Sequence, residues 1–174
     1  MNKIIICLII PALLFGLSSC VKERDCNAGP NISDLDQEQL REDIEGIEKY
    51  LEENNIPYET DASGIRFSII ERGTGVPPNY CSSVIVDYEG RVLGETEIFD
   101  ANNPNAARPF QVEVNGNIIL GWKFALVRMN RNADYRVFIP SQLAYGEEGR
   151  LASDSTYIIP PNANLEFRIR LNNY

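Results

Sequence analysis

The sequence predicts an α+β fold in which about five antiparallel strands pack against one short α-helix. Two patterns support this prediction: several runs alternate apolar and polar residues, and one central segment has apolar residues at helical spacing. A longer helix precedes this unit. The chain has 174 residues, which suits a single domain with appended segments.

The first residues are typical of a signal peptide. A short basic start is followed by an almost wholly apolar run from Ile4 to Leu17, which is short for a membrane span. Ser18 and Ser19 then precede Cys20 in a pattern that resembles a bacterial lipobox. We therefore expect residues 1–19 to be removed and Cys20 to be lipidated. An ordinary signal peptide cleaved nearby is the alternative.

Residues 20–33 are polar and contain a Gly-Pro pair, which predicts a flexible lipidated tether. Residues 1–19 hold one of the 16 basic residues and no acidic one, so the remaining chain has 15 basic and 25 acidic residues and a net charge of −10. Because no run of Lys and Arg gathers positive charge, we do not expect nucleic acid as a partner. The negative charge favours solubility.

The cysteine and histidine content limits the chemistry. Once Cys7 leaves with the signal peptide and Cys20 is acylated, Cys26 and Cys81 remain. These two either pair in a disulfide between tether and domain or stay as separate thiols, and the sequence leaves both open. The chain has no histidine, which excludes Ser-His-Asp and Cys-His catalysis. We expect neither a metal site nor a cofactor.

Residues 34–55 are predicted to form the N-terminal helix. Asp36 is the expected N-cap, with Gln39 as its capping-box partner and Leu35 placed to contact Leu40. The apolar stripe of this helix consists of Leu40, Ile44, Ile47 and Leu51. We expect the stripe to pack on the domain that follows. Packing against the same helix of a second copy, which would give a homodimer, is the alternative.

Residues 56–174 are predicted to form the domain and to fold alone, because all strands with period-two alternation lie within them. The alternating apolar residues are Ile65, Phe67 and Ile69; Val84, Val86 and Tyr88; Phe110, Val112 and Val114; Tyr135, Val137 and Ile139; and Leu165, Phe167, Ile169 and Leu171. The short helix is expected to begin near Gly121. Its stripe consists of Trp122, Ala125, Leu126 and Met129. Two long turn-rich segments, 94–108 and 145–161, indicate functional loops.

Five short motifs in this domain resemble those of the FKBP family of peptidyl-prolyl cis/trans isomerases. They are Val86-Asp87-Tyr88-Glu89-Gly90, Ile98-Phe99-Asp100, Ile118-Ile119-Leu120-Gly121-Trp122, Leu143-Ala144-Tyr145-Gly146 and Ile158-Ile159-Pro160-Pro161-Asn162-Ala163. Each motif alone is weak, but their order and spacing agree with the family from about Thr60 to Tyr174. The resemblance implies a curved antiparallel sheet wrapped around a short helix, in agreement with the elements derived above.

The resemblance also implies an apolar pocket that accepts proline. The expected catalytic residues are Tyr88, Phe99, Asp100 and Tyr145, and the expected substrate-binding residues are Ile118, Ile119, Trp122, Ile158, Ile159 and Phe167. In the family, the Tyr145 hydroxyl and the backbone N–H at Ile119 are expected to hold substrate carbonyls. Trp122 is expected to form the floor, and Asp100 to polarise the site. Without the resemblance, core filling by the aromatic residues and turn capping by Asp100 are the ordinary interpretations.

Two loops depart from the family pattern. Residues 101–107, which follow the Phe-Asp pair, lack the basic residue that many members place there to fix the Asp, and only Arg108 could replace it. The later loop, residues 147–157, is longer than in compact members and lacks the histidine that some of them carry. These departures affect the expected substrate range and catalytic rate.

The resemblance implies an isomerase that acts on X-Pro bonds of exported proteins, whose uncatalysed rotation takes tens of seconds or more. A non-catalytic binding or chaperone module of the cell envelope is the alternative. The expected location is the bacterial envelope, with the lipid at Cys20 as the membrane anchor. Val21 after this cysteine resembles outer-membrane sorting, while Lys22-Glu23 resembles a surface-export signal.

Overall fold

The computed structural model describes residues 25–102 and 109–173. Its helices and strands, in chain order, are α1 Gln37–Glu53, β1 Glu59–Thr60, β2 Arg66–Glu71, β3 Ser83–Val92, β4 Ile98–Ala101, β5 Gln111–Glu113, α2 Leu120–Leu126, β6 Asp134–Ile139, the 3₁₀ turns η1 Ser141–Leu143 and η2 Gly146–Glu148, β7 Arg150–Leu151, β8 Tyr157–Ile159 and β9 Leu165–Asn173. The predicted Cys20 lipidation site and the signal peptide lie outside the described residues.

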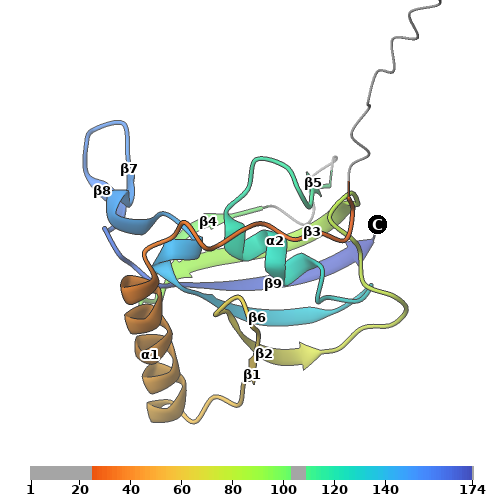
Figure 1. The fold of residues 1–174 in the computed structure, drawn as a ribbon, viewed down its shortest axis with the longest axis horizontal. Helices are drawn as coiled ribbons and strands as arrows, with labels where there is room; N and C mark the ends of the chain where they lie inside the picture. The colour runs from red at the N-terminus through yellow and green to blue at the C-terminus, as the bar shows by residue number, and fades with distance from the viewer. Residues whose placement is uncertain (1–24, 103–108, 174) are drawn as a thin grey trace, which may run out of the picture.

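Within the described ranges, seven strands form one antiparallel sheet in the order β1-β2-β6-β9-β3-β4. Strand β3 pairs with β9 along one edge, and with β5 and then β4 along the other. Helix α2 crosses one face of this sheet (Figure 1). The α+β fold and all five predicted strands are confirmed. The sequence patterns missed the short strands β1 and β4 and the separate β7–β8 hairpin.

Two glycines of the family-like motifs allow close contacts beneath the sheet and the helix. A Cβ atom at Gly90 in β3 would lie 2.4 Å from the ring of Phe167, and one at Gly121 in α2 would lie 2.4 Å from the side chain of Ile139. Real Cβ atoms do not approach so closely, so a larger residue would force apart β3 and β9, or α2 and β6. The glycines therefore set how near the backbone comes to the core.

Helix α1 packs on its own domain. Its residues Ile47 and Leu51 are fully buried and form a small cluster with Phe138 of β6. Leu40, two turns earlier, belongs to the main core, which also contains Ile65. The expectation that the stripe packs on the following domain is confirmed, and these side chains are not available to a second copy.

Buried polar contacts also hold α1. The Asp43 carboxylate, only 3% exposed, accepts hydrogen bonds from the Ser141 hydroxyl at 2.6 Å and from the backbone N–H of Gln142 at 3.3 Å. Beside this pair, Asn164 donates to the Asp43 carbonyl at 3.2 Å and accepts from the Ser141 N–H at 3.0 Å. These groups satisfy one another away from water, so removing one leaves buried partners unpaired.

The start of α1 follows the prediction in part. Asp36 caps the helix as expected, accepting from the N–H groups of Glu38 and Gln39. The capping box does not form, because the Gln39 side chain donates to Asp43 and the Asp36 N–H reaches the side chain of Gln142. A tertiary contact thus replaces the local reciprocal one.

A nearly buried ion pair joins α1 to β2. The Arg66 guanidinium lies 2.8 Å from Glu48 and also donates to the carbonyls of Gly64 and Ile65. An arginine at this depth requires such partners, because an unpaired buried charge is strongly destabilising. The stability of the domain therefore depends in part on the side chain of Glu48 on α1.

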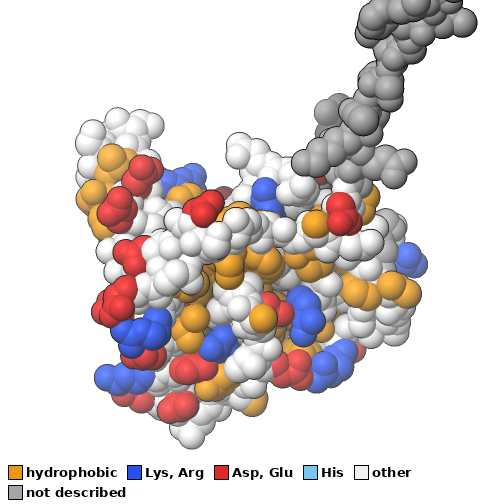
Figure 2. Space-filling view, viewed as in Figure 1, with side chains coloured by type: hydrophobic (Ala, Val, Ile, Leu, Met, Phe, Trp, Pro, Cys, Tyr) orange, Lys and Arg blue, Asp and Glu red, His pale blue; other side chains and the backbone are white. Residues whose placement is uncertain are grey.

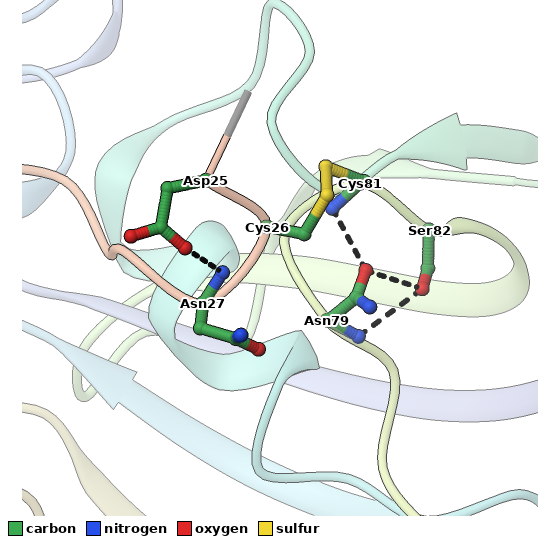
Figure 3. Close-up of a disulfide and its surroundings, with 6 residues drawn as sticks. All are labelled: Asp25, Cys26, Asn27, Asn79, Cys81 and Ser82. Carbon is green, nitrogen blue, oxygen red and sulfur yellow. Dashed lines mark hydrogen bonds between the residues drawn. A yellow bond between two sulfur atoms is a disulfide. The ribbon is translucent and has the colours of Figure 1, made fainter. Parts of the chain in front are cut away.

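The open question of Cys26 and Cys81 is resolved in favour of a disulfide, which joins the described start of the chain to the segment before β3 (Figure 3). The Asn79 side chain accepts from the N–H of Cys81 and the hydroxyl of Ser82 and thereby orders the turn that carries Cys81. Among the described helices, none combines the length and the apolar character needed to cross a membrane.

Candidate active site

A pocket of about 410 Å³ opens between the sheet and the start of α2. Its walls come from β3, β4, β9, the loop before α2 and the turn that follows η1. The lining residues are Tyr88, Asp100, Phe110, Asn117, Ile118, Ile119, Trp122, Tyr145 and Phe167. Seven of the ten residues that the sequence predicted for the site are therefore brought together here.

Aromatic rings form the interior of the pocket. Trp122, at the first turn of α2, meets Tyr88 edge-on with ring centres 4.9 Å apart and Phe167 edge-on at 5.4 Å. Phe110 closes one side by packing against Tyr88 at 5.2 Å. Edge-to-face contacts of this kind hold the rings in fixed orientations. The result is a pocket whose interior is lined by packed aromatic rings, Trp122 among them.

The polar groups of the pocket gather at its rim. Asp100 lies within β4, where it is paired in register with Gly90 of β3. Burial raises the pKa of Tyr88 to about 12, and the negative charge of Asp100 and a hydrogen bond with it act in the same direction. The Tyr88 phenol therefore stays protonated at physiological pH and holds the Asp100 carboxylate in place.

Tyr145 reaches the pocket from the other side. It precedes η2, and its carbonyl accepts a hydrogen bond from the N–H of Gly149 at 3.1 Å. The carbonyl of Gly146 accepts from Asn162 at 2.7 Å, which ties the two ends of the hairpin segment together. These backbone contacts fix the turn from which Tyr145 lines the pocket together with Asp100.

Three predicted residues lie elsewhere. Phe99 packs behind the pocket against Phe167, with ring centres 5.7 Å apart. Ile158 and Ile159 are neighbours on β8 and so point to opposite faces. Ile159 is fully buried in the core, whereas Ile158 lines a separate hollow with Phe99 and Tyr157. A motif places residues near one another in sequence, but the strand geometry decides which of them face the pocket.

Three residues near the pocket were not predicted as part of the site. Phe110 was expected only as a strand residue, and its alternation with Val112 gave no signal of the pocket. Asn117 lies in the loop before α2 and has no sequence signal. Asn102 holds the start of the altered loop, since its amide accepts from the N–H of Tyr88 at 2.6 Å and donates to the Val86 carbonyl at 3.2 Å.

Arg108, the only basic residue expected to replace the family's usual partner of Asp100, lies outside the described residues. Among the described residues, Tyr88 hydrogen-bonds this carboxylate, and that bond helps to raise the pKa of the phenol. In residues 25–102 and 109–173, no cluster of three or more His, Cys, Asp or Glu side chains is arranged to hold a metal ion.

Comparison with known proteins agrees with this architecture. The family model for FKBP-type peptidyl-prolyl cis-trans isomerase matches residues 76–172. The FKBP-type 22 kDa peptidyl-prolyl cis-trans isomerase of Escherichia coli is 37% identical over 129 residues, covering 73% of this chain and 58% of that protein. Outer membrane protein MIP of Legionella longbeachae is 35% identical over 109 residues, covering 63% of this chain and 43% of that protein.

The fold is also similar to solved structures. A crystal structure of a peptidyl-prolyl cis-trans isomerase from Pseudomonas syringae pv. tomato aligns with a TM-score of 0.59 and 30% sequence identity, covering 76% of this chain and 92% of that one. The chain spans about half the length of the curated relatives that it matches. The family match extends from the segment before β3 to the end of β9 and so includes every described residue of the pocket. The chain therefore belongs to the family of FKBP-type peptidyl-prolyl cis-trans isomerases.

Proposed function

We propose that this chain is a peptidyl-prolyl cis/trans isomerase that catalyses rotation about X-Pro bonds in polypeptides. The observation that supports this most directly is the pocket itself. Its interior is built from aromatic and branched apolar side chains, and its polar groups lie at the rim. A proline ring fits the apolar interior, while the flanking peptide groups meet Asp100, Tyr145 and the backbone before α2.

The reaction requires no covalent step. Rotation about the X-Pro bond is slow because amide resonance resists twisting, with a barrier of roughly 18–20 kcal/mol. The twisted amide has lost this resonance and is less polar than either planar form. A dry aromatic pocket therefore stabilises the twisted state relative to the planar states and lowers the barrier. The protein's part is to desolvate and hold the proline.

Five of the nine lining residues have a proposed role in this step. Trp122 and Phe167 support the proline ring, the Tyr145 hydroxyl and the Ile119 N–H donate to substrate carbonyls, and Asp100 polarises the rim. The indole N–H of Trp122 is buried and has no acceptor among the described residues. An unpaired buried donor of this kind is costly to the folded state.

Measured isomerase activity tests the proposal. We expect the wild-type chain to accelerate isomerisation of several X-Pro peptides in a protease-coupled assay. Tyr145→Phe removes one hydroxyl and keeps the ring, so kcat/KM should fall by about three- to tenfold, the effect of one lost hydrogen bond of about 1 kcal/mol. The thermal unfolding midpoint should be unchanged.

The matched control is Tyr157→Phe, because Tyr157 is 54% exposed on the β7–β8 hairpin and does not line the pocket. Its kcat/KM should equal that of the wild type. If no X-Pro peptide is isomerised faster than in buffer while proline peptides still bind, the chain is a binding module and the isomerase proposal is rejected.

We further propose that the chain is a lipoprotein of the bacterial cell envelope, anchored through Cys20 and directed to the outer membrane. The apolar run ending in Ser18-Ser19-Cys20 supports this, as does the name of one relative, an outer membrane protein of Legionella longbeachae. Metabolic labelling with a fatty acid should label the wild type and leave Cys20→Ala unlabelled. Equal labelling of both would rule out this anchor.

A further inference from the structure

The described chain begins next to an apolar surface that the proposed reaction does not use. A hollow of about 580 Å³ lies between the β2–β3 connection and the outer side of α2. Its apolar members are Val76, Pro77, Pro78, Tyr80, Phe124 and Val127. We name these six residues the α2 outer patch. In Figure 2, hydrophobic side chains reach the surface over the β2–β3 connection and along α2.

Val76 is the most exposed member of this patch. Its side chain is 75% exposed, which is the largest value among the exposed large hydrophobic residues of the described chain. Pro77 beside it is also exposed, and Phe124 and Val127 are half-buried. Tyr80 is also half-buried and Pro78 is buried, so Val76 and Pro77 are the exposed members of the patch. Adjoining exposed apolar residues beside a hollow are a feature of surfaces that contact another molecule.

The disulfide places this patch beside the end of the proposed anchor. Cys26 lines the same hollow, and its carbonyl accepts a hydrogen bond from the N–H of Tyr80 at 3.0 Å. Figure 3 shows Asp25, Cys26 and Asn27 alongside the turn that carries Cys81. The chain therefore leaves the domain at the edge of the α2 outer patch.

The length of the connecting segment limits which face can meet a membrane. Cys20 and Cys26 are six residues apart, so the segment between them reaches about 20 Å at most. A compact domain of this size is roughly 35–40 Å across. Without the disulfide, the first residue held by the domain would be Ile32, which packs against the core. The segment between Cys20 and the domain would then be about twice as long. With the disulfide, only the face around Cys26 reaches the bilayer.

From the short connection and the apolar hollow at its end, we infer that the α2 outer patch is a membrane-docking surface that rests on the phospholipid bilayer. This inference depends on the proposed lipid anchor at Cys20. The connecting residues themselves do not suit the hollow, because Lys22, Glu23, Arg24 and Asp25 are all charged. Val76 and Pro77 enter the interfacial region, while Arg128, 57% exposed at its side chain and ion-paired with Asp61 at 3.3 Å, also lines the hollow.

Docking in this way leaves the active site open. Trp122 and Phe124 are two positions apart in α2, so they project about 200° apart around the helix. Trp122 lines the proline pocket and Phe124 lines the outer hollow, and the two sets of lining residues share no member. The anchored enzyme would hold its pocket away from the lipid while the opposite side of α2 touches it.

Hydroxyl-radical footprinting of the acylated chain in vesicles tests the inference. The vesicles contain phosphatidylethanolamine and phosphatidylglycerol, and the reference is the mature chain with Cys20→Ser in solution. Oxidation of Val76 and Phe124 should be several-fold slower on vesicles. Leu151 and Tyr157, exposed on the β7–β8 hairpin at the other end of the view in Figure 1, should be oxidised at equal rates in both samples.

A substitution distinguishes a patch that rests on the bilayer from one that is only held near it by the anchor. Val76→Glu should restore fast oxidation of Phe124 on vesicles, whereas the matched control Ile70→Glu, at a 51% exposed position on β2, should leave it slow. Equal oxidation rates of Val76 and Phe124 on vesicles and in solution would overturn the inference. Protection that rises with the amount of protein at a fixed amount of lipid would also overturn it, because it would show that a second copy covers the patch. Flotation reports the anchor separately, because a chain that fails to float with vesicles contradicts the lipid anchor itself.

Discussion

Deletion of residues 1–55 should abolish the cooperative thermal unfolding of the domain. This deletion removes α1 and so exposes Phe138, which is now fully buried with Ile47 and Leu51. Burying each large apolar side chain contributes about 1.5–3 kcal/mol, and whole domains are stable by only about 5–15 kcal/mol. The sequence patterns predict that residues 56–174 fold alone, and the packing of α1 speaks against that prediction.

The same deletion also leaves buried polar groups without partners. Arg66, 7% exposed, would lose Glu48, and the Ser141 hydroxyl would lose the Asp43 carboxylate. Because the Glu48 side chain is 33% exposed and loss of the helix opens Arg66 to water, the cost is smaller than that of breaking a fully buried pair, which is about 3–5 kcal/mol. Together with the apolar loss, this is comparable to the whole stability of a domain.

The control for this experiment is deletion of residues 1–35. Both truncated chains lack Cys26 and hence the disulfide, so they differ only in α1 and its N-cap. The shorter deletion should keep a cooperative transition by calorimetry and the longer one should not. If residues 56–174 unfold cooperatively at the same temperature as residues 36–174, α1 contributes nothing to the domain and this reading of its contacts is wrong.

Asp100→Ala should lower kcat/KM at least tenfold while the domain stays folded. The carboxylate lies at the rim of an apolar pocket, where a charge acts more strongly on a bound peptide than it would in water. A tenfold loss corresponds to about 1.4 kcal/mol of barrier. Asp100→Asn keeps the shape and removes the charge, so its activity should be equally low if the charge is responsible.

A titration of the Asp100 variant supplies a second readout. In the wild type, burial, the Asp100 charge and the hydrogen bond raise the pKa of Tyr88 to about 12 from the model-compound value of 10.0. A pKa raised on folding stabilises the native state below pH 10.0 and this contribution is lost as the pH rises toward 12. Asp100→Ala should lower the Tyr88 pKa in ultraviolet titration but keep it above 10.0, because burial remains.

Glu113→Ala is the matched control for Asp100, since Glu113 is an exposed acidic residue on β5 that does not line the pocket. Its variant should retain wild-type kcat/KM and the wild-type Tyr88 titration. Wild-type kcat/KM in Asp100→Ala, combined with a lowered Tyr88 pKa, would show that Asp100 holds Tyr88 but takes no part in the reaction.

The sequence alone determined the elements and the family. Alternation with period two depends only on which face of a strand is buried, so it located β2, β3, β5, β6 and β9 correctly. The Asp36 cap and the Trp122 helix are likewise local features, readable from residues a few positions apart. The motifs then indicated six residues, and the family resemblance a seventh, Phe167, that the structure places together in one pocket.

Contacts between residues far apart in the sequence became known only from the tertiary structure. Asp43 and Ser141 are 98 positions apart, and nothing local in either predicts that they meet. The same holds for the Cys26–Cys81 disulfide, 55 positions apart, and for Asn102, whose amide reaches back to β3. Ile159 lies in the core and Phe110 lines the pocket because the packing of the chain orients each backbone segment. A sequence pattern gives only the spacing of apolar residues along the chain.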